Sequence, residues 1–211
     1  MTKNINRKGQ TRLNPFFEPY NTPHETIPFD KITLADYEEA MLEGIRREDE
    51  QIEKTINDPE EPTFENTLIR EDEVKGRKHY YDLLSRVESA FFNMLSAETN
   101  DEMDALAQKM NPILTKHAND VSLNPKLFER IKAVYNKHRE LTPEENKLLE
   151  ESYDGFVRSG ALLNENDKEK LRKLTEERER AQLLFVDVEA SRDKAAEVEA
   201  RQLIENLVVG E

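Results

Sequence analysis

Four histidines are the residues of this 211-residue chain whose spacing most directly tests for metal chemistry. Two histidines one helical turn apart, with a glutamate after the first, can bind zinc and position a water molecule for attack on a peptide bond. His24 is followed by Glu25, but Pro28 occupies the place of the second histidine. A second histidine at this spacing is also missing after the other three, which are His79, His117 and His138. The sequence therefore predicts no metal-binding residue and no cofactor in this chain.

Two runs of acidic residues, 48–50 and 71–73, could supply a general acid and a general base. Consecutive residues on a helix point in different directions, and nothing nearby in sequence indicates the burial that would separate the roles of two carboxylates. We therefore interpret both runs as solvated helix faces. Calcium-loop, P-loop and Gly-x-Ser-x-Gly motifs are also missing from the sequence. The sequence predicts no catalytic residue, and a small hydrolase built on clustered carboxylates is the weakest alternative.

Composition restricts the partners and the compartment that we expect. The net charge of -14 would repel a phosphate backbone, so nucleic acid is not an expected partner. The absence of cysteine excludes disulfides and thiolate zinc sites. No apolar run approaches the roughly 18 residues that span a bilayer, and the first thirteen residues contain no signal-peptide core. We expect a cytoplasmic protein that does not bind membranes.

The same composition predicts an all-α protein. Charged residues make up 36% of the chain and there are only 6 glycines, a balance typical of long solvated helices. Four prolines between residues 14 and 32 forbid a continuous helix there. We therefore predict a multi-helix bundle with an extended, proline-rich amino-terminal arm over residues 1–32 and a helical domain over residues 33–211. The only strand signal is the short Val208-Val209 pair.

Capping residues predict where the helices begin. Thr33 with Asp36 starts a helix over about 34–57, and Thr63 starts a second that reaches roughly to Ala97. The middle of this second helix is weakly apolar, contains Gly76 and is expected to fray, bend or protrude. Further starts are expected at Asn100, with a kink at Pro112, at Asn124 for 125–139, at Thr142 for 143–159, and near Asn166 for a last long helix.

Apolar spacing predicts the buried faces, and Gly160 predicts a left-handed helix exit. In each aromatic pair, at 16–17, 80–81 and 91–92, we expect one ring in the core and the other in a neighbouring groove, rather than a peptide-binding platform. The stretch from Thr175 to Glu211 has two interpretations. It is either a partner-binding amphipathic helix or a helix that packs on a segment outside this sequence. Expected buried residues include Leu127, Phe128, Ile131, Tyr135, Leu148, Leu149, Tyr153, Phe156 and Val157.

Several ordered strings carry a family resemblance. These are NPFFEPYNTPHETIPFD at 14–30, PEEPTFENTL at 59–68, ESAFFNMLSAETND at 88–101 and the segment 123–163, which contains LNPKLF and FVRSGALL. In this order they resemble the opening third of a zinc-dependent oligopeptidase of the thimet oligopeptidase and peptidyl-dipeptidase family, and most of all the bacterial peptidyl-dipeptidase branch. The resemblance covers about residues 14–174. Arg70 to Tyr81 is longer than the family pattern, which suggests an insertion or an altered helix.

The resemblance implies a function for the chain as part of a larger protein. Family members are helical ellipsoids with a deep channel, in which the amino-terminal helices form a wall and zinc is bound later by a His-Glu-x-x-His helix. It implies a non-catalytic amino-terminal domain that restricts the channel to short peptides. Its partners would be the catalytic domain of the same parent chain, where zinc is expected, and oligopeptide substrates through that parent. The alternative is a stand-alone acidic helical protein-interaction module.

Overall fold

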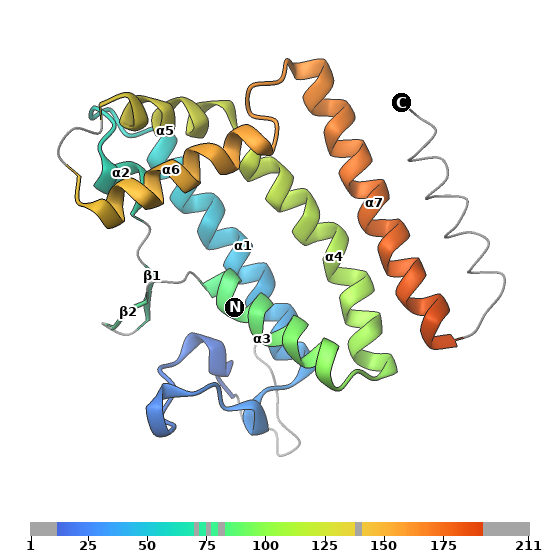
Figure 1. Cartoon of the computed structure of the whole chain (residues 1–211). Coiled ribbons are helices and arrows are strands. Elements are labelled where there is room, and N and C mark those ends of the chain that lie inside the picture. Colours follow the sequence, from blue (N-terminus) through green and yellow to red (C-terminus); the bar gives the residue numbers. More distant parts are fainter. Residues whose placement is uncertain (1–11, 70–71, 75–76, 80–82, 138–140, 192–211) are drawn as a thin grey trace. The chain divides into compact units, whose positions relative to one another are not determined.

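The structure is a computed structural model that describes residues 12–69, 72–74, 77–79, 83–137 and 141–191 (Figure 1). Helices dominate these residues, so the all-α prediction is confirmed. In chain order the elements are α1 (Leu34–Ile56), α2 (Phe64–Leu68), β1 (Asp72–Val74), β2 (Arg77–His79), α3 (Leu83–Ala97), α4 (Asp101–Ser122), α5 (Pro125–Lys137), α6 (Pro143–Arg158) and α7 (Glu165–Ser191). Within the described ranges, no helix has the length and apolar character needed to cross a membrane.

The predicted helix starts are confirmed by their hydrogen bonds. Thr33 and Asp36 form a reciprocal capping box at the start of α1, and Thr142 and Glu145 form another at α6. At α5, the backbone N–H of Leu127 donates to Asn124 Oδ1 over 3.1 Å. Corresponding caps at Thr63 and Asn100 begin α2 and α4. Gly160 has φ of 92°, the left-handed exit expected after α6.

The prediction of one continuous helix from Thr63 to about Ala97 is wrong. After α2 the chain forms an antiparallel hairpin of β1 and β2, in which Glu73 is paired with Lys78, and only then enters α3. The weakly apolar middle of this segment had no helical face to bury, so a local strand ladder forms instead. The sequence signalled no strand in this segment, and the two short strands β1 and β2 correct that interpretation. The hairpin falls within residues 70–81, where an insertion or an altered helix is expected.

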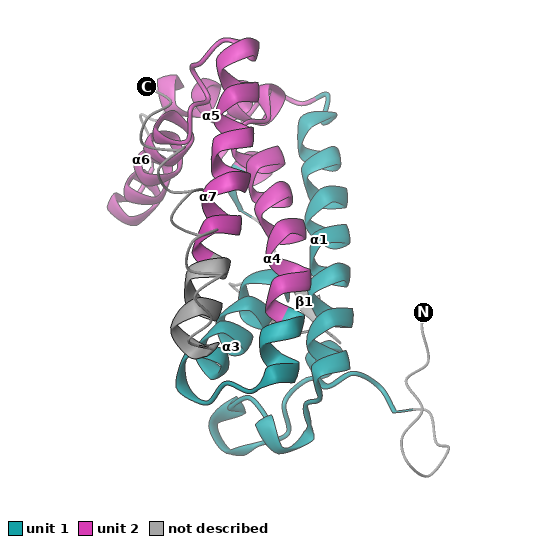
Figure 2. Ribbon diagram, turned by 90° about the vertical axis from the view of Figure 1, so that its right-hand side faces the viewer, with its two compact units in different colours: residues 1–59, 68–106 teal, residues 60–67, 107–211 magenta. Residues whose placement is uncertain are grey.

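The chain divides into two compact units, residues 1–59 with 68–106 and residues 60–67 with 107–211 (Figure 2). In the first unit α1 packs closely against α3 at Gly44, where an added Cβ would lie 2.8 Å from Leu84 Cα. An aromatic row continues this core. The rings of Phe16 and Tyr37 have centroids 5.3 Å apart, and those of Tyr37 and Phe91 are also 5.3 Å apart. Edge and tilted contacts of this kind add to the stabilisation from burial.

In the second unit α5 and α6 pack through stacked rings. Tyr153 lies between Tyr135, at a centroid distance of 4.2 Å, and Phe128, at 5.6 Å. Leu127, Phe128 and Ile131 are buried as predicted, and Tyr135 is half-buried. The prediction for α6 is wrong at Leu148, which is 44% exposed while Leu149 is 1% exposed. Adjacent residues on a helix point about 100° apart, so only one of the two leucines can face this core.

The aromatic pairs at 16–17 and 91–92 each have one buried ring as predicted, whereas other predictions stay open. Phe16 and Phe91 are buried and their neighbours Phe17 and Phe92 are half-buried, as expected of adjacent aromatic residues. α4 runs without a break through Pro112, and the expected kink stays a prediction. The pair Tyr80-Tyr81 and the chain beyond Ser191, with most of the Thr175–Glu211 stretch, lie outside the described residues. The division into an arm over 1–32 and a helical domain over 33–211 stays a prediction.

A cluster of charges covers the exposed face of α1. Glu43 accepts from Arg46 Nη2 at 2.7 Å and from Arg47 Nε at 2.9 Å, while Arg46 also pairs with Glu50. In the run 48–50, Asp49 and Glu50 are exposed on the helix as predicted, and Glu48 is half-buried. The same interpretation of the run 71–73 is wrong, because Asp72 and Glu73 lie on strand β1. The hydrogen bond from Arg46 is the main cause that lowers the pKa of Glu43 to about 2, and Arg47 contributes further.

The close approach of α1 and α3 can be tested with a matched pair of substitutions. Gly44→Ala should destabilise the protein by about 1–3 kcal/mol, because the new Cβ meets the backbone of Leu84 and forces the helices apart. Gly155→Ala makes the same change in α6, where nothing lies within 4 Å of the added Cβ. It should stabilise the helix by about 0.5–1 kcal/mol. Urea unfolding measures both, and a Gly44→Ala protein as stable as the parent would refute the close contact.

The Glu43 cluster predicts a dependence of stability on pH. The pKa of Glu43 is lower in the folded chain than its usual 4.5, so ionised Glu43 stabilises the fold above that pH. Its contribution declines as the pH falls from about 4.5 toward 2. Glu43→Gln should therefore lower the melting temperature at pH 7, and the difference from the parent should shrink across this range. Glu150→Gln, at an exposed site on α6, serves as the control. An equal, pH-independent loss in both variants would contradict the prediction.

Candidate functional site

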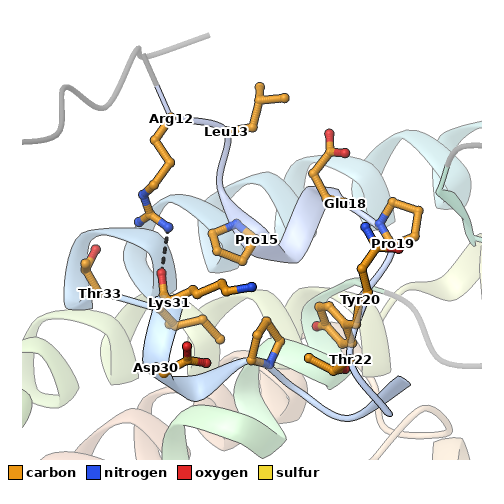
Figure 3. A pocket seen from close by; sticks show the side chains of 13 residues that line it. Arg12, Leu13, Pro15, Glu18, Pro19, Tyr20, Thr22, Asp30, Lys31 and Thr33 are labelled. Carbon is orange, nitrogen blue, oxygen red and sulfur yellow. Dashed lines mark hydrogen bonds between the residues drawn. The ribbon is translucent and has the colours of Figure 1, made fainter. Parts of the chain in front are cut away.

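The amino-terminal arm encloses a pocket of about 440 Å³ in the first unit (Figure 3). Two limbs of the arm form it, residues 12–22 and residues 28–33. Its apolar lining comes from Leu13, Pro15, Pro19, Pro28, Ile32 and the ring of Tyr20. Its charged lining comes from Arg12, Glu18, Asp30 and Lys31. The pocket therefore combines an apolar surface with charges of both signs.

Short turns and one anchor give the first limb its shape. The prolines prevent a long helix, and the arm instead contains single 3₁₀ turns at Pro15–Phe17, Pro23–Glu25 and Phe29–Lys31. Asn14 caps the first turn by accepting from the Phe16 N–H at 3.0 Å, and its amide donates to the Asp36 carbonyl at 2.8 Å. Phe16 is completely buried against Tyr37. These contacts fix the first limb to α1.

Asp36 ties the two limbs to the start of α1. Its side chain is completely buried, and Oδ2 accepts from both the backbone N–H and the hydroxyl of Thr33, each at 2.7 Å. The same oxygen accepts from the guanidinium of Arg12, which also donates to the Lys31 carbonyl at 2.6 Å (Figure 3). Arg12 of the first limb is therefore bonded to the second limb and to a buried carboxylate. Its charge is already balanced by Asp36.

Tyr20 supplies one wall of the pocket. Its hydroxyl oxygen is buried. Burial raises the pKa of Tyr20, and the nearby positive charge of Arg86 on α3 offsets part of this effect. Tyr20 therefore stays neutral through the physiological range and contributes its ring to the lining of the pocket. It is not placed to act as a base.

Asp30 and Lys31 are the charged residues of the lining whose side chains remain available. Both are exposed, and neither side chain has an ion pair or hydrogen bond with another described residue. Glu18 already has a partner. In Figure 3 the side chain of Lys31 extends toward the middle of the lining side chains, and Asp30 lies on the same limb. The arrangement can bind a polar ligand, but it holds no nucleophile next to a base.

The charged residues of the lining share no motif in the sequence. Arg12, Asp30 and Lys31 are ordinary surface residues in sequence, and only the folding back of the arm brings them together. One signal was present. The cluster of four prolines with large apolar residues between positions 14 and 32 indicated a segment with a defined, non-helical shape packed on the helices.

Two of the four histidines, His24 and His117, have described side chains. His24 is exposed in the second 3₁₀ turn, with φ of 58°, and belongs to the first unit. His117 is buried in α4 and belongs to the second unit. The side chains of His79 and His138 lie outside those that the structure describes. Over the ranges with described side chains, no three histidine, aspartate, glutamate or cysteine residues come together in a cluster that could hold a metal ion.

Comparison with known proteins gives two clear relatives, although no protein-family model matches the chain. The dipeptidyl carboxypeptidase of Salmonella typhimurium is 36% identical over 166 residues, which are 78% of this chain and 24% of that protein. The dipeptidyl carboxypeptidase of Escherichia coli K12 is 34% identical over 169 residues, which are 79% of this chain and 24% of that protein. The chain thus spans about a quarter of the length of the curated relatives it matches.

This degree of identity extends over nearly four fifths of the chain, too far for a short shared motif to account for it. It confirms the resemblance that the ordered strings between residues 14 and 163 indicated. The chain is therefore a relative of the bacterial dipeptidyl carboxypeptidases, in the peptidyl-dipeptidase branch of the zinc-dependent oligopeptidases.

Proposed function

We propose that this chain is the non-catalytic amino-terminal region of a peptidyl-dipeptidase-like zinc metallopeptidase that acts in the cytoplasm. One observation carries the proposal. A match of 36% identity covers most of the chain but only 24% of the related dipeptidyl carboxypeptidase. The remaining three quarters of such a protein would hold the zinc ion, its ligands and the catalytic glutamate. That catalytic domain is the partner we propose for this chain.

The role we propose for these helices is steric. They would form one wall of the substrate channel, and they would admit short, flexible oligopeptides while excluding folded proteins. The long helices of the described part support this role, because a helix with a buried apolar face is a rigid wall element. Its selectivity would come from the shape of the channel rather than from chemistry. Removal of dipeptides from the carboxyl end of a substrate would be the work of the complete protein.

A chimera tests whether the chain can serve as this region. Residues 14–174 would replace the matching segment of the Salmonella dipeptidyl carboxypeptidase, and dipeptide release would be measured with peptides of increasing length. We expect hydrolysis within roughly tenfold of the native relative, a change of about 1.4 kcal/mol in barrier height, and a retained preference for short peptides. The relative lacking the segment is the control and should be inactive or unselective. A folded chimera without hydrolysis would contradict the proposal and favour the interaction module.

A second experiment tests the isolated chain. Purified protein would be incubated with zinc and a blocked tripeptide, and product release would be followed by chromatography. We expect no turnover above the zinc-only control, because the described side chains form no site for the ion. Turnover that disappears when a chelator is added would reveal a metal site elsewhere in the chain. That result would reject the non-catalytic role.

A further inference from the structure

The arm pocket contains two charges of opposite sign, beside an apolar surface, that have no partner among the described residues. Asp30 and Lys31 line the pocket, and their side chains make no ion pair or hydrogen bond with another described residue. The other two charged residues of the lining already have partners, because Arg12 is bonded to Asp36 and Glu18 interacts with another residue. The pocket therefore offers one ammonium and one carboxylate to a ligand. A ligand that pairs with both by charge carries a negative and a positive group.

The apolar lining defines the rest of the ligand. Pro15, Pro19, Pro28 and the ring of Tyr20 provide rigid surfaces with few rotatable bonds. Such surfaces bind an apolar side chain at a low cost in conformational entropy. The volume of about 440 Å³ lies within the range of roughly 300–1,000 Å³ that is typical of small-ligand sites. A single zwitterionic amino acid would leave much of this space empty, whereas a dipeptide would fill more of it.

The pocket is held in shape before any ligand binds. Phe16 is buried in the core of the first unit, and Asn14 bonds both to the 3₁₀ turn and to α1. Arg12 joins the first limb to the Lys31 carbonyl of the second. The hydrogen bond from Arg12 to the Lys31 carbonyl holds the main chain of Lys31 in position. The side chain of Lys31 extends toward the other lining residues (Figure 3). A preformed site retains more of its interaction energy as affinity.

We propose that this pocket binds a dipeptide with free, charged ends and an apolar carboxyl-terminal residue. The carboxylate of the dipeptide pairs with Lys31, its ammonium group pairs with Asp30, and its apolar side chain lies on the proline and Tyr20 surface. This site goes beyond the proposed function and does not depend on it, since it is formed entirely by residues 12–33 of this chain.

Nuclear magnetic resonance titration of the full chain with the dipeptide Ala-Phe tests the proposal. We expect saturable shifts in the amide signals of residues 12–33, with a dissociation constant on the order of 1 mM. Acetylating the amino group of Ala-Phe, or amidating its carboxylate, should each weaken binding by about fivefold, as expected when one solvent-exposed ion pair is lost. Phenylalanine alone should bind more weakly than Ala-Phe, which distinguishes a dipeptide site from an amino-acid site.

Two variants assign the charges. Lys31→Met should weaken binding of Ala-Phe by about fivefold and leave binding of Ala-Phe amide unchanged, because the amide has no carboxylate to lose. Asp30→Asn should also weaken binding of Ala-Phe by about fivefold. It should leave binding of N-acetylated Ala-Phe unchanged, because that ligand has no ammonium group to lose. Lys54→Met, an exposed site on α1 away from the pocket lining, is the matched control and should not alter binding.

Three results would contradict the proposed dipeptide site. The first is the lack of any shift with up to about 20 mM Ala-Phe, some twentyfold above the expected dissociation constant. The second is a set of shifts that fall outside residues 12–33. The third is an equal loss of Ala-Phe binding in Lys31→Met and Lys54→Met. Near-ultraviolet circular dichroism of each variant confirms that the fold is retained, and the Asp30→Asn series decides the question if Lys31→Met is misfolded.

Discussion

The buried carboxylate of Asp36 is the group on which the arrangement of the amino-terminal arm depends. One of its oxygens accepts from Thr33 twice and from Arg12, and the other is buried without a partner among the described residues. A buried carboxylate is costly unless it is paired and hydrogen-bonded. Arg12 and the Thr33 cap together meet this requirement, so the beginning of α1 and the folding back of the arm are coupled. The pocket between the two limbs is a consequence of that coupling.

The rest of the first unit follows from close packing around a few large residues. Phe16, Tyr37 and Phe91 form a continuous aromatic row from the arm through α1 to α3. Gly44 lets the backbone of α3 approach α1 more closely than any residue with a Cβ would allow. Burial of these rings offsets the loss of chain entropy in an arm that has little regular secondary structure. The exposed face of α1 carries the Glu43 cluster instead, which contributes to solubility and to local stability.

The chain is related to the dipeptidyl carboxypeptidases, and its described side chains form no cluster that could hold a metal ion. The shared sequence covers about a quarter of the length of the relatives, and the described histidines belong to separate units. A steric role is consistent with both facts. The arm pocket adds a second feature, because it presents charges and apolar surface suited to recognition rather than to bond cleavage.

Local signals in the sequence determined the fold class, most helix starts and the left-handed exit at Gly160. These signals act within one helical turn, as the capping boxes at Thr33 and Thr142 illustrate. Tertiary structure alone decided which of Leu148 and Leu149 faces the core. It also decided that Arg12, Asp30 and Lys31 surround one pocket. The physical reason is that burial and charge pairing depend on residues distant along the chain, which no local spacing records.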